Sequence, residues 1–177
     1  MELKRPIIIE GPDGAGKTTL LERLAEDMDL PVFHTGGPIL TMDQLRKKLE
    51  DMRKRRRTHL FDRCPHISDP IYAKAAGRRP VMDAEVIRDL LAWELSPVIV
   101  YCRLEATAHM LELVSGKVKA HKSPEHLAMV QTKYLDIVDD YDNLFADRIP
   151  GVLVLRYDWQ HSDYNSLLEK LKCAASY

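Results

Sequence analysis

The sequence lacks the cysteine pattern of a disulfide-stabilised or zinc-binding protein. Its 177 residues include three cysteines, Cys64, Cys102 and Cys173, which are widely spaced and form no C-x-x-C pair. An odd number of scattered cysteines is neither a disulfide framework nor a zinc site. Reduced thiols are typical of the cytoplasm, so we expect a cytoplasmic protein, in the host cytoplasm if it is viral. Cys102 lies in an apolar run, which predicts a core position.

Long apolar segments and an excess of charge of one sign are also absent. The apolar run at 7–9 is too short for a signal peptide, no segment is long enough to span a bilayer, and we expect no membrane partner. The formal net charge is -1. Overall charge therefore gives no reason to expect a polyanionic partner, and binding of nucleic acid would need a local basic patch.

Short β-branched runs alternate with stretches of helical periodicity, which predicts an α/β fold. The predicted strands span 6–10, 30–35, 59–62, 97–102 and 151–157. The predicted helices span about 17–27, 41–57, 82–95, 105–114, 123–145 and 164–174. Several strands are nearly continuous apolar runs, which favours a parallel sheet of about five strands with helices on both faces. We expect one domain over residues 1–177, with no repeat or linker.

The segment from Gly11 to Thr18 fits the phosphate-loop pattern G-x-x-x-x-G-K-[ST], with a strand before it and a helix after it. Glycines let successive backbone N–H groups turn toward phosphate oxygens, and the following helix adds its dipole. Lys17 would reach the β- and γ-phosphates, and Thr18 would offer a hydroxyl to Mg²⁺. We predict ATP and Mg²⁺ as cofactors. The predicted ATP-binding residues are Gly11, Pro12, Asp13, Gly14, Ala15, Gly16, Lys17, Thr18 and Thr19.

These residues carry a resemblance to a known family. The opening "IIIEGPDGAGKTTL" resembles the E-G-x-[DE]-G-x-G-K-[ST]-T loop of thymidylate kinases, and "HLFDRCPHISDPIY" resembles that family's D-R-[YS]…S…Y segment. "VIVYCRLEA" resembles its fourth strand, and "YLDIVDDYDNLF" resembles the helix after its lid. The resemblance implies a P-loop kinase that transfers the γ-phosphoryl group of ATP to a thymidine-type acceptor.

Four residues are candidate catalytic residues: Lys17, Asp62, Arg63 and Asp13. Asp62 ends a predicted strand, where a carboxylate could hold Mg²⁺ together with Thr18 or accept a proton from an attacking hydroxyl. Arg63 offers planar donors to a phosphoryl oxygen, and the resemblance places it between the donor and acceptor phosphates. Asp13 and Asp62 are the candidate general bases for a hydroxyl acceptor, and His34 is a third.

The resemblance also implies a lid at about 115–123. Thymidylate kinases with no basic residue inside the phosphate loop supply arginines from this lid. Here the lid has no arginine and instead carries Lys117, Lys119, His121 and Lys122. One or more of these lysines would neutralise charge on the migrating phosphoryl group, although a lysine cannot bind two oxygens as a planar fork.

The acceptor side departs from the family. Asp62 follows Lys17 by 45 residues, an interval considerably longer in thymidylate kinases, and no Phe-x-x-x-Arg element follows Gly36 and Gly37. The intervening helix ends in the basic run 53–57, which is either a solvated helix end or a patch for a nucleic-acid backbone. With the shortened interval, the second interpretation favours the viral 5-hydroxymethyl-deoxyuridine DNA kinases, which act on modified bases in phage DNA.

Two alternatives stay open at this point. One is a kinase for a free deoxynucleoside monophosphate such as dTMP. The other is a P-loop ATPase without transfer activity, against which the Asp62–Arg63 pair and the lack of an N-K-x-D motif argue.

The remaining aromatic and histidine residues are weaker candidates. Tyrosines and one tryptophan at core-like spacing are expected to pack in the interior: Tyr72, Trp93, Tyr101, Tyr134 and Tyr141. His66 and Asp69, in a predicted loop after Arg63, are placed where they could touch the acceptor. Three further histidines share no ligand spacing with other metal-binding residues: His109, His126 and His161.

Overall fold

A computed structural model describes residues 3–35, 41–81, 95–104, 124–146 and 148–176. Its centre is a five-stranded, all-parallel sheet in the order β2-β3-β1-β4-β5. The strands are β1 (Ile7–Glu10), β2 (Val32–His34), β3 (Leu60–Asp62), β4 (Val98–Cys102) and β5 (Leu153–Tyr157). The predicted five-stranded parallel sheet is thereby confirmed.

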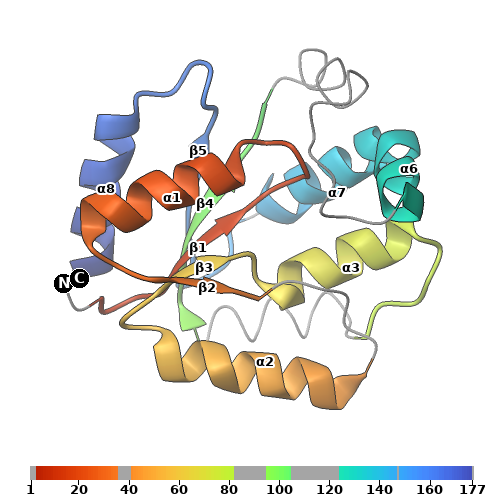
Figure 1. Cartoon of the computed structure of the whole chain (residues 1–177), viewed down its shortest axis with the longest axis horizontal. Coiled ribbons are helices and arrows are strands. Elements are labelled where there is room, and N and C mark those ends of the chain that lie inside the picture. The colour runs from red at the N-terminus through yellow and green to blue at the C-terminus, as the bar shows by residue number, and fades with distance from the viewer. Residues whose placement is uncertain (1–2, 36–40, 82–94, 105–123, 147, 177) are drawn as a thin grey trace.

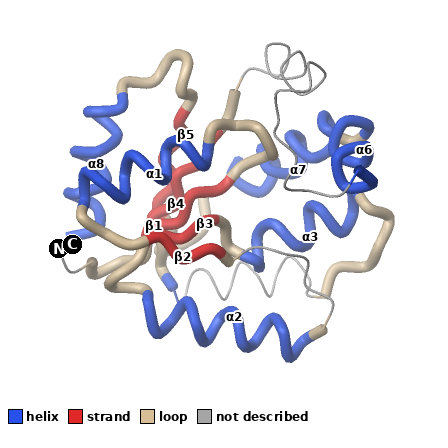
Figure 2. Tube along the Cα trace, in the orientation of Figure 1, coloured by secondary structure: helices blue, strands red, loops and turns tan. Residues whose placement is uncertain are grey.

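The helices form a layer on each face of the sheet (Figure 1). Helices α1 (Lys17–Met28) and α8 (Tyr164–Ser176) pack on one face. The other face carries α2 (Met42–Arg55), α3 (Pro65–Ala75), α6 (Pro124–Thr132) and α7 (Tyr134–Ala146). Figure 2 shows the strands enclosed between these two layers. The sheet is covered on both sides, which explains why its central strands are almost entirely apolar.

Alternation along the strands divides the core between the two layers. In β1, Ile7 and Ile9 pack toward α1 and α8, whereas Ile8 packs toward α2, α3 and α7. All three isoleucines are fully buried, as are the five residues of β4. Cys102 is part of this core, which confirms its predicted packing role.

Two helix predictions need correction. The helix predicted over 123–145 is two helices, α6 and α7, which are separated at Lys133. The segment after Arg63, predicted as a loop, is helix α3, and both His66 and Asp69 lie on it. Pro65 stands at the start of α3, where proline is favourable, but Pro70 inside it obscures the helical pattern. The predicted helix over 105–114, all but the last residue of the predicted helix over 82–95, the predicted lid, Trp93 and His109 lie outside the described residues.

No helix in the described part of the chain is both long enough and apolar enough to cross a membrane. The three cysteines are not paired with one another; Cys64 is buried like Cys102, and Cys173 is exposed.

The buried side chain of His66 makes the fold sensitive to acid. Burial and the charge of Arg53 lower the pKa of His66 to about 4, against the opposing charge of Asp69. Its Nε2 atom is buried without a hydrogen-bond partner. Because the unfolded chain binds the proton more readily, stability is expected to fall between about pH 6.5 and pH 4, by up to about 3 kcal/mol.

Urea unfolding at several pH values would measure this loss. We expect His66→Gln to remove 2–3 kcal/mol, roughly, of the pH-dependent difference, while His161→Gln, at an exposed position, leaves it unchanged. Parallel pH curves for the wild-type protein and His66→Gln would contradict the prediction.

Candidate active site

The candidate phosphate loop leaves the carboxyl end of β1 and leads directly into α1. Three of its glycines have positive φ angles, 138° at Gly11, 80° at Gly14 and 78° at Gly16. A Cβ atom at Gly11 would lie 2.3 Å from the Cys102 carbonyl oxygen, so the loop can pass this close to β4 only with glycine there.

The first turn of α1 is arranged as an anion site. Its N-cap residue is Gly16, no side chain caps the helix, and no acidic residue occupies the first turn. The first backbone N–H groups of a helix have no partner within it and carry partial positive charge. Thr18 and Thr19 are exposed on this turn. Phosphate oxygens are the ligands that such a turn favours.

Lys17 is buried beside the loop, with 7% of its surface exposed. Its Nζ atom donates a hydrogen bond of 2.5 Å to the carbonyl oxygen of Pro12. Burial and the neighbouring Arg63 lower the pKa of Lys17 to about 8, and the charge of Asp13 opposes that shift. The ammonium group is thus held inside the loop.

Arg63 brings a second cation to the loop from the neighbouring strand. Its Nη2 atom donates to Asp13 Oδ1 at 2.5 Å and to the Tyr72 hydroxyl at 3.3 Å. Its Nη1 atom donates to the Tyr141 hydroxyl at 3.1 Å. The guanidinium therefore joins the phosphate loop to α3 and α7. The structure places Arg63 beside Asp13.

Glu10 lies beneath this cluster and is completely buried. Its Oε1 atom accepts from the Cys64 N–H and the Ser68 hydroxyl, and its Oε2 atom accepts from the Gly11 N–H and the Tyr141 hydroxyl. Burial raises the pKa of Glu10, whereas Arg63, the Cys64 N–H and the Tyr141 hydroxyl oppose that shift. The two N–H groups and two hydroxyls that contact the Glu10 oxygens all donate, which is the pattern that an ionised carboxylate requires.

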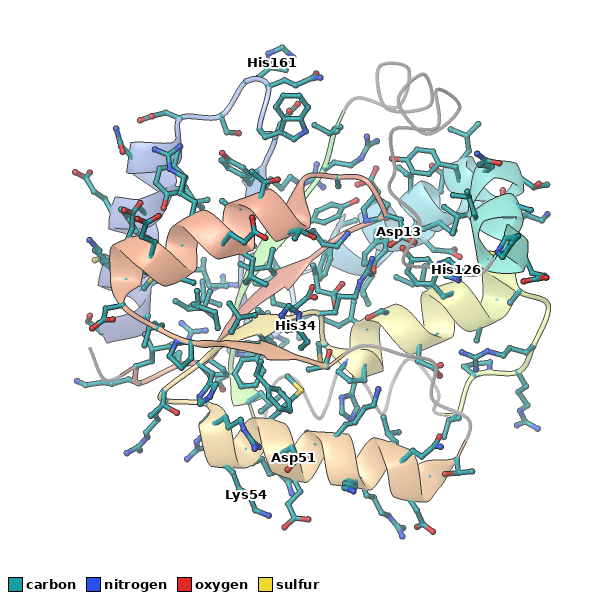
Figure 3. All side chains as sticks on the ribbon, viewed as in Figure 1. Asp13, His34, Asp51, Lys54, His126 and His161 are labelled. Atoms are coloured by element: carbon teal, nitrogen blue, oxygen red, sulfur yellow. The ribbon has the colours of Figure 1, made fainter. Side chains whose placement is uncertain are left out.

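Asp13 is held from both sides. While Arg63 contacts Oδ1, the Nε2 atom of His126 lies 3.1 Å from Oδ2 (Figure 3). The His126 ring stacks on Tyr72, with ring centroids 6.0 Å apart, and the Tyr72 hydroxyl accepts from the Asp13 N–H. Helix α6, which carries His126, is thereby connected to the phosphate loop. These contacts leave Asp13 poorly placed to act as a general base.

Asp62 forms a pair with His34 at the carboxyl ends of β3 and β2. The two residues are register partners, and His34 Nδ1 lies 2.9 Å from Asp62 Oδ2. Thr35 fixes this edge by donating its hydroxyl to the carbonyl oxygens of Asp62 and Arg63. The structure thus brings together two of the three candidate bases.

The residues present fit ATP and Mg²⁺. No group of three or more His, Cys, Asp or Glu residues among those described could hold a metal, so the protein has no preformed cage in this part of the chain. Mg²⁺ in kinases is held instead by one or two protein oxygens together with phosphate oxygens. Thr18 and Asp62 can supply those protein oxygens.

The basic run 53–57 does not border this site. Helix α2 runs antiparallel to the strands, and it spans about 20 Å because it has 14 residues. Its end lies at the amino edge of the sheet, where the Arg57 carbonyl accepts from the Leu3 N–H. Figure 3 shows Lys54 and Asp51 far from Asp13. Lys54 and Arg55 also pair with acidic residues one turn earlier, so this run supports a solvated helix end.

Sequence reasoning missed four contributors to the site: Glu10, Tyr72, His126 and Tyr141. Tyr72 and Tyr141 are predicted as packing residues. Tyr141 is indeed buried in the core, but the hydroxyl groups of both tyrosines hold Arg63. A signal did exist for Glu10, since an acidic residue ends an otherwise apolar buried strand.

Comparisons with known proteins give a likeness in fold. No protein-family model and no curated protein matches the chain. Among solved structures, the YorR protein from Bacillus subtilis, in complex with phosphorylated GDP, is similar with a TM-score of 0.64, 15% identity and coverage of 95% of this chain and 94% of YorR. The deoxyadenosine kinase from M. mycoides with bound dATP gives a TM-score of 0.55, 16% identity and coverage of 96% and 98%.

A shikimate kinase from Acinetobacter baumannii is similar with a TM-score of 0.54, 15% identity and coverage of 97% of this chain and 93% of the enzyme. The chain has the fold of P-loop kinases. At these identities the likeness shows the fold and not the acceptor.

Gly16, like Gly11, is a position where the loop should tolerate a side chain poorly. A Cβ atom there would lie 2.8 Å from Cδ1 of Trp159, and the φ angle of 78° is strained for any other residue. We expect Gly16→Ala to lower the free energy of unfolding by about 2–3 kcal/mol, because the cost of backbone strain and the cost of displacing the Trp159 ring add.

Gly77→Ala is a matched control. Gly77 also has a positive φ angle, 67°, but a Cβ atom there would meet nothing within 4 Å. Its substitution should cost about 1–2 kcal/mol from backbone strain alone. In a Trp93→Phe background, which leaves Trp159 as the single tryptophan, Gly16→Ala should shift the emission spectrum and Gly77→Ala should not. Equal emission and equal denaturation curves for the two variants would contradict the prediction.

Proposed function

We propose that the protein is an ATP- and Mg²⁺-dependent kinase that transfers the γ-phosphoryl group of ATP in line to an acceptor. The observation that carries this proposal is the contact of Arg63 with Asp13 of the phosphate loop, at 2.5 Å. This contact supports a role for Arg63, the residue directly after β3, as a planar donor to the migrating phosphoryl group.

Each residue has a distinct task in this proposal. The backbone N–H groups of the loop and of the first turn of α1 bind the phosphates. Lys17 exchanges its contact with the Pro12 carbonyl for the β- and γ-phosphates, and Arg63 stabilises charge that develops on the γ-phosphoryl group. Mg²⁺, held by Thr18 and Asp62, would neutralise phosphate charge when bound. Lysines of the predicted lid complete the set.

The preferred acceptor is a thymidine-type base, the hydroxymethyl group of 5-hydroxymethyl-deoxyuridine in DNA. The resemblance to thymidylate kinases supports the thymine-like ring, and the short interval between Lys17 and Asp62 supports an acceptor side without a closed pocket. A hydroxyl acceptor needs a group that receives its proton. For this role we prefer Asp62, oriented by His34, to Asp13, and in that role Asp62 would hold Mg²⁺ through water and not directly. The base would leave the DNA stack to reach the γ-phosphate.

A free deoxynucleotide such as dTMP is the second candidate. The observation that favours it is the position of the basic run at the amino edge of the sheet, at the opposite edge from the loop, where it gives a DNA acceptor no contact beside the site. The deoxyadenosine kinase among the structural neighbours likewise acts on a free nucleoside, as its name states.

Labelled ATP distinguishes these acceptors. We expect transfer of label to an oligonucleotide containing 5-hydroxymethyl-uracil and little transfer to dTMP. Label that enters dTMP alone would overturn the DNA acceptor and leave the kinase proposal standing. Steady hydrolysis of ATP without any labelled acceptor would identify an ATPase and overturn the proposal as a whole.

Lys17→Ala tests whether the loop carries the reaction. Removal of the ammonium group should abolish transfer to either acceptor, by at least about 10³-fold, because charge on the phosphates is then left without its partner. Lys170→Ala, on α8, is the control and should transfer at the wild-type rate. A Lys17→Ala variant with more than a tenth of wild-type activity would contradict the assignment of ATP to this loop.

A further inference from the structure

Glu10 connects the end of β1 to the chain that follows β3. The Cys64 N–H donates to Glu10 Oε1 at 2.5 Å, and the Arg63 N–H donates to the Ile9 carbonyl at 3.0 Å. Two successive backbone groups after β3 are therefore fixed by two successive residues of β1. The carboxylate replaces a strand partner at the point where regular pairing ends.

The residue fixed in this way is in a strained conformation. Arg63 has a φ angle of 70°, in the left-handed region that residues other than glycine rarely adopt. Such a residue keeps this conformation only where its surroundings hold it there. The bond from Cys64 to Glu10 lies on the residue directly after the strained one, so the buried carboxylate opposes relaxation of Arg63 to an ordinary backbone conformation.

Glu10 also acts on the guanidinium through Tyr141. The Tyr141 hydroxyl donates to Glu10 Oε2 at 3.0 Å and accepts from Arg63 Nη1 at 3.1 Å. A hydroxyl has one hydrogen. Because the carboxylate takes that hydrogen, the oxygen lone pairs face the arginine. Glu10 therefore sets the direction of the hydrogen bond that orients Arg63, although its own oxygen lies 4.0 Å from Nη1.

We infer that Glu10 and Tyr141 are positioning residues that hold Arg63 ready for the migrating phosphoryl group. This inference rests on the kinase function proposed above. Neither residue contacts ATP in this assignment. Both would act through Arg63, from the buried side of the loop, and so would change the rate of transfer and not the binding of ATP.

Tyr141→Phe tests this role because it removes one hydroxyl and keeps the ring in the core. We expect kcat for transfer of label to the better acceptor to fall about tenfold, with KM for ATP changed less than about twofold. Tyr101→Phe is the matched control. Tyr101 stacks on Tyr141 at 5.8 Å and is equally buried, but its hydroxyl donates to Asp142. Its kcat should stay within about twofold of wild type.

A double-mutant cycle separates positioning from general damage. In an Arg63→Ala background, measured by single turnover, Tyr141→Phe should change the rate by less than about twofold, since the group that it orients is gone. Glu10→Gln should likewise change the rate little in the Arg63→Ala background. In the protein that keeps Arg63, its loss of rate should be larger than that of Tyr141→Phe. Its amide would present a donor where the carboxylate accepts.

Three results would overturn the inference. The first is that Tyr141→Phe lowers the rate as much in the Arg63→Ala background as in the wild-type background. The second is that Tyr141→Phe and Tyr101→Phe lower kcat equally. The third is that Tyr141→Phe changes KM for ATP and leaves kcat unchanged. A wild-type protein that binds ATP but labels no acceptor would instead overturn the proposed kinase function and this inference with it.

Discussion

The buried carboxylate of Glu10 is the contact on which the arrangement of the site depends. Removal of an ionised carboxylate from water costs several kcal/mol unless donors and an opposite charge replace the water. Glu10 receives two backbone N–H groups and two hydroxyls, and Arg63 and Lys17 lower its pKa from the value that burial alone would produce. The donors come from β1, from the start of α3 and from α7. One carboxylate thereby fixes three elements against each other at the carboxyl edge of the sheet.

The same charges explain how the loop is stable before a nucleotide binds. Glu10, Asp13 and Lys17 are buried, and together with the partly buried Arg63 they form a set with two charges of each sign. On the proposed function, ATP adds negative charge, so Arg63 and Lys17 must exchange Asp13 and the Pro12 carbonyl for phosphate oxygens. The two exchanges differ, because Arg63 would replace one anionic acceptor with another, whereas Lys17 would replace a neutral carbonyl with a charged phosphate oxygen. Glu10 keeps its donors throughout, which is why the cations can change partners without loss of the backbone framework.

The sequence predicts the part of the site that is local in the chain. Gly11 to Thr18 are contiguous, and their spacing specifies a strand, a tight loop and a helix, so both the sheet and the loop follow from periodicity and motif. The side chains that complete the site are distant in the chain. Tyr141 is 131 residues from Glu10, and His126 is 113 residues from Asp13. Apolar spacing predicts that Tyr141 is buried and says nothing of where its hydroxyl points. Helix α3 escapes prediction because Pro70 interrupts its helical pattern.

The direction of the strands determines at which edge of the sheet the basic run 53–57 lies, and this follows from the order of strands and helices along the chain. In a parallel sheet, a helix that follows one strand and precedes the next must return the chain from the carboxyl edge to the amino edge. Residues 53–57 directly precede β3 and so must lie at the amino edge, whereas ligands of α/β folds bind at the carboxyl edge. The charge of this run alone suggests a contact with a polyanion. The topology shows that such a contact would lie at the opposite edge of the sheet from the phosphate loop. On the proposed function, acceptor recognition therefore has to come from segments at the carboxyl edge, which begin with His34 and Thr35 at the end of β2 and with Arg63 after β3.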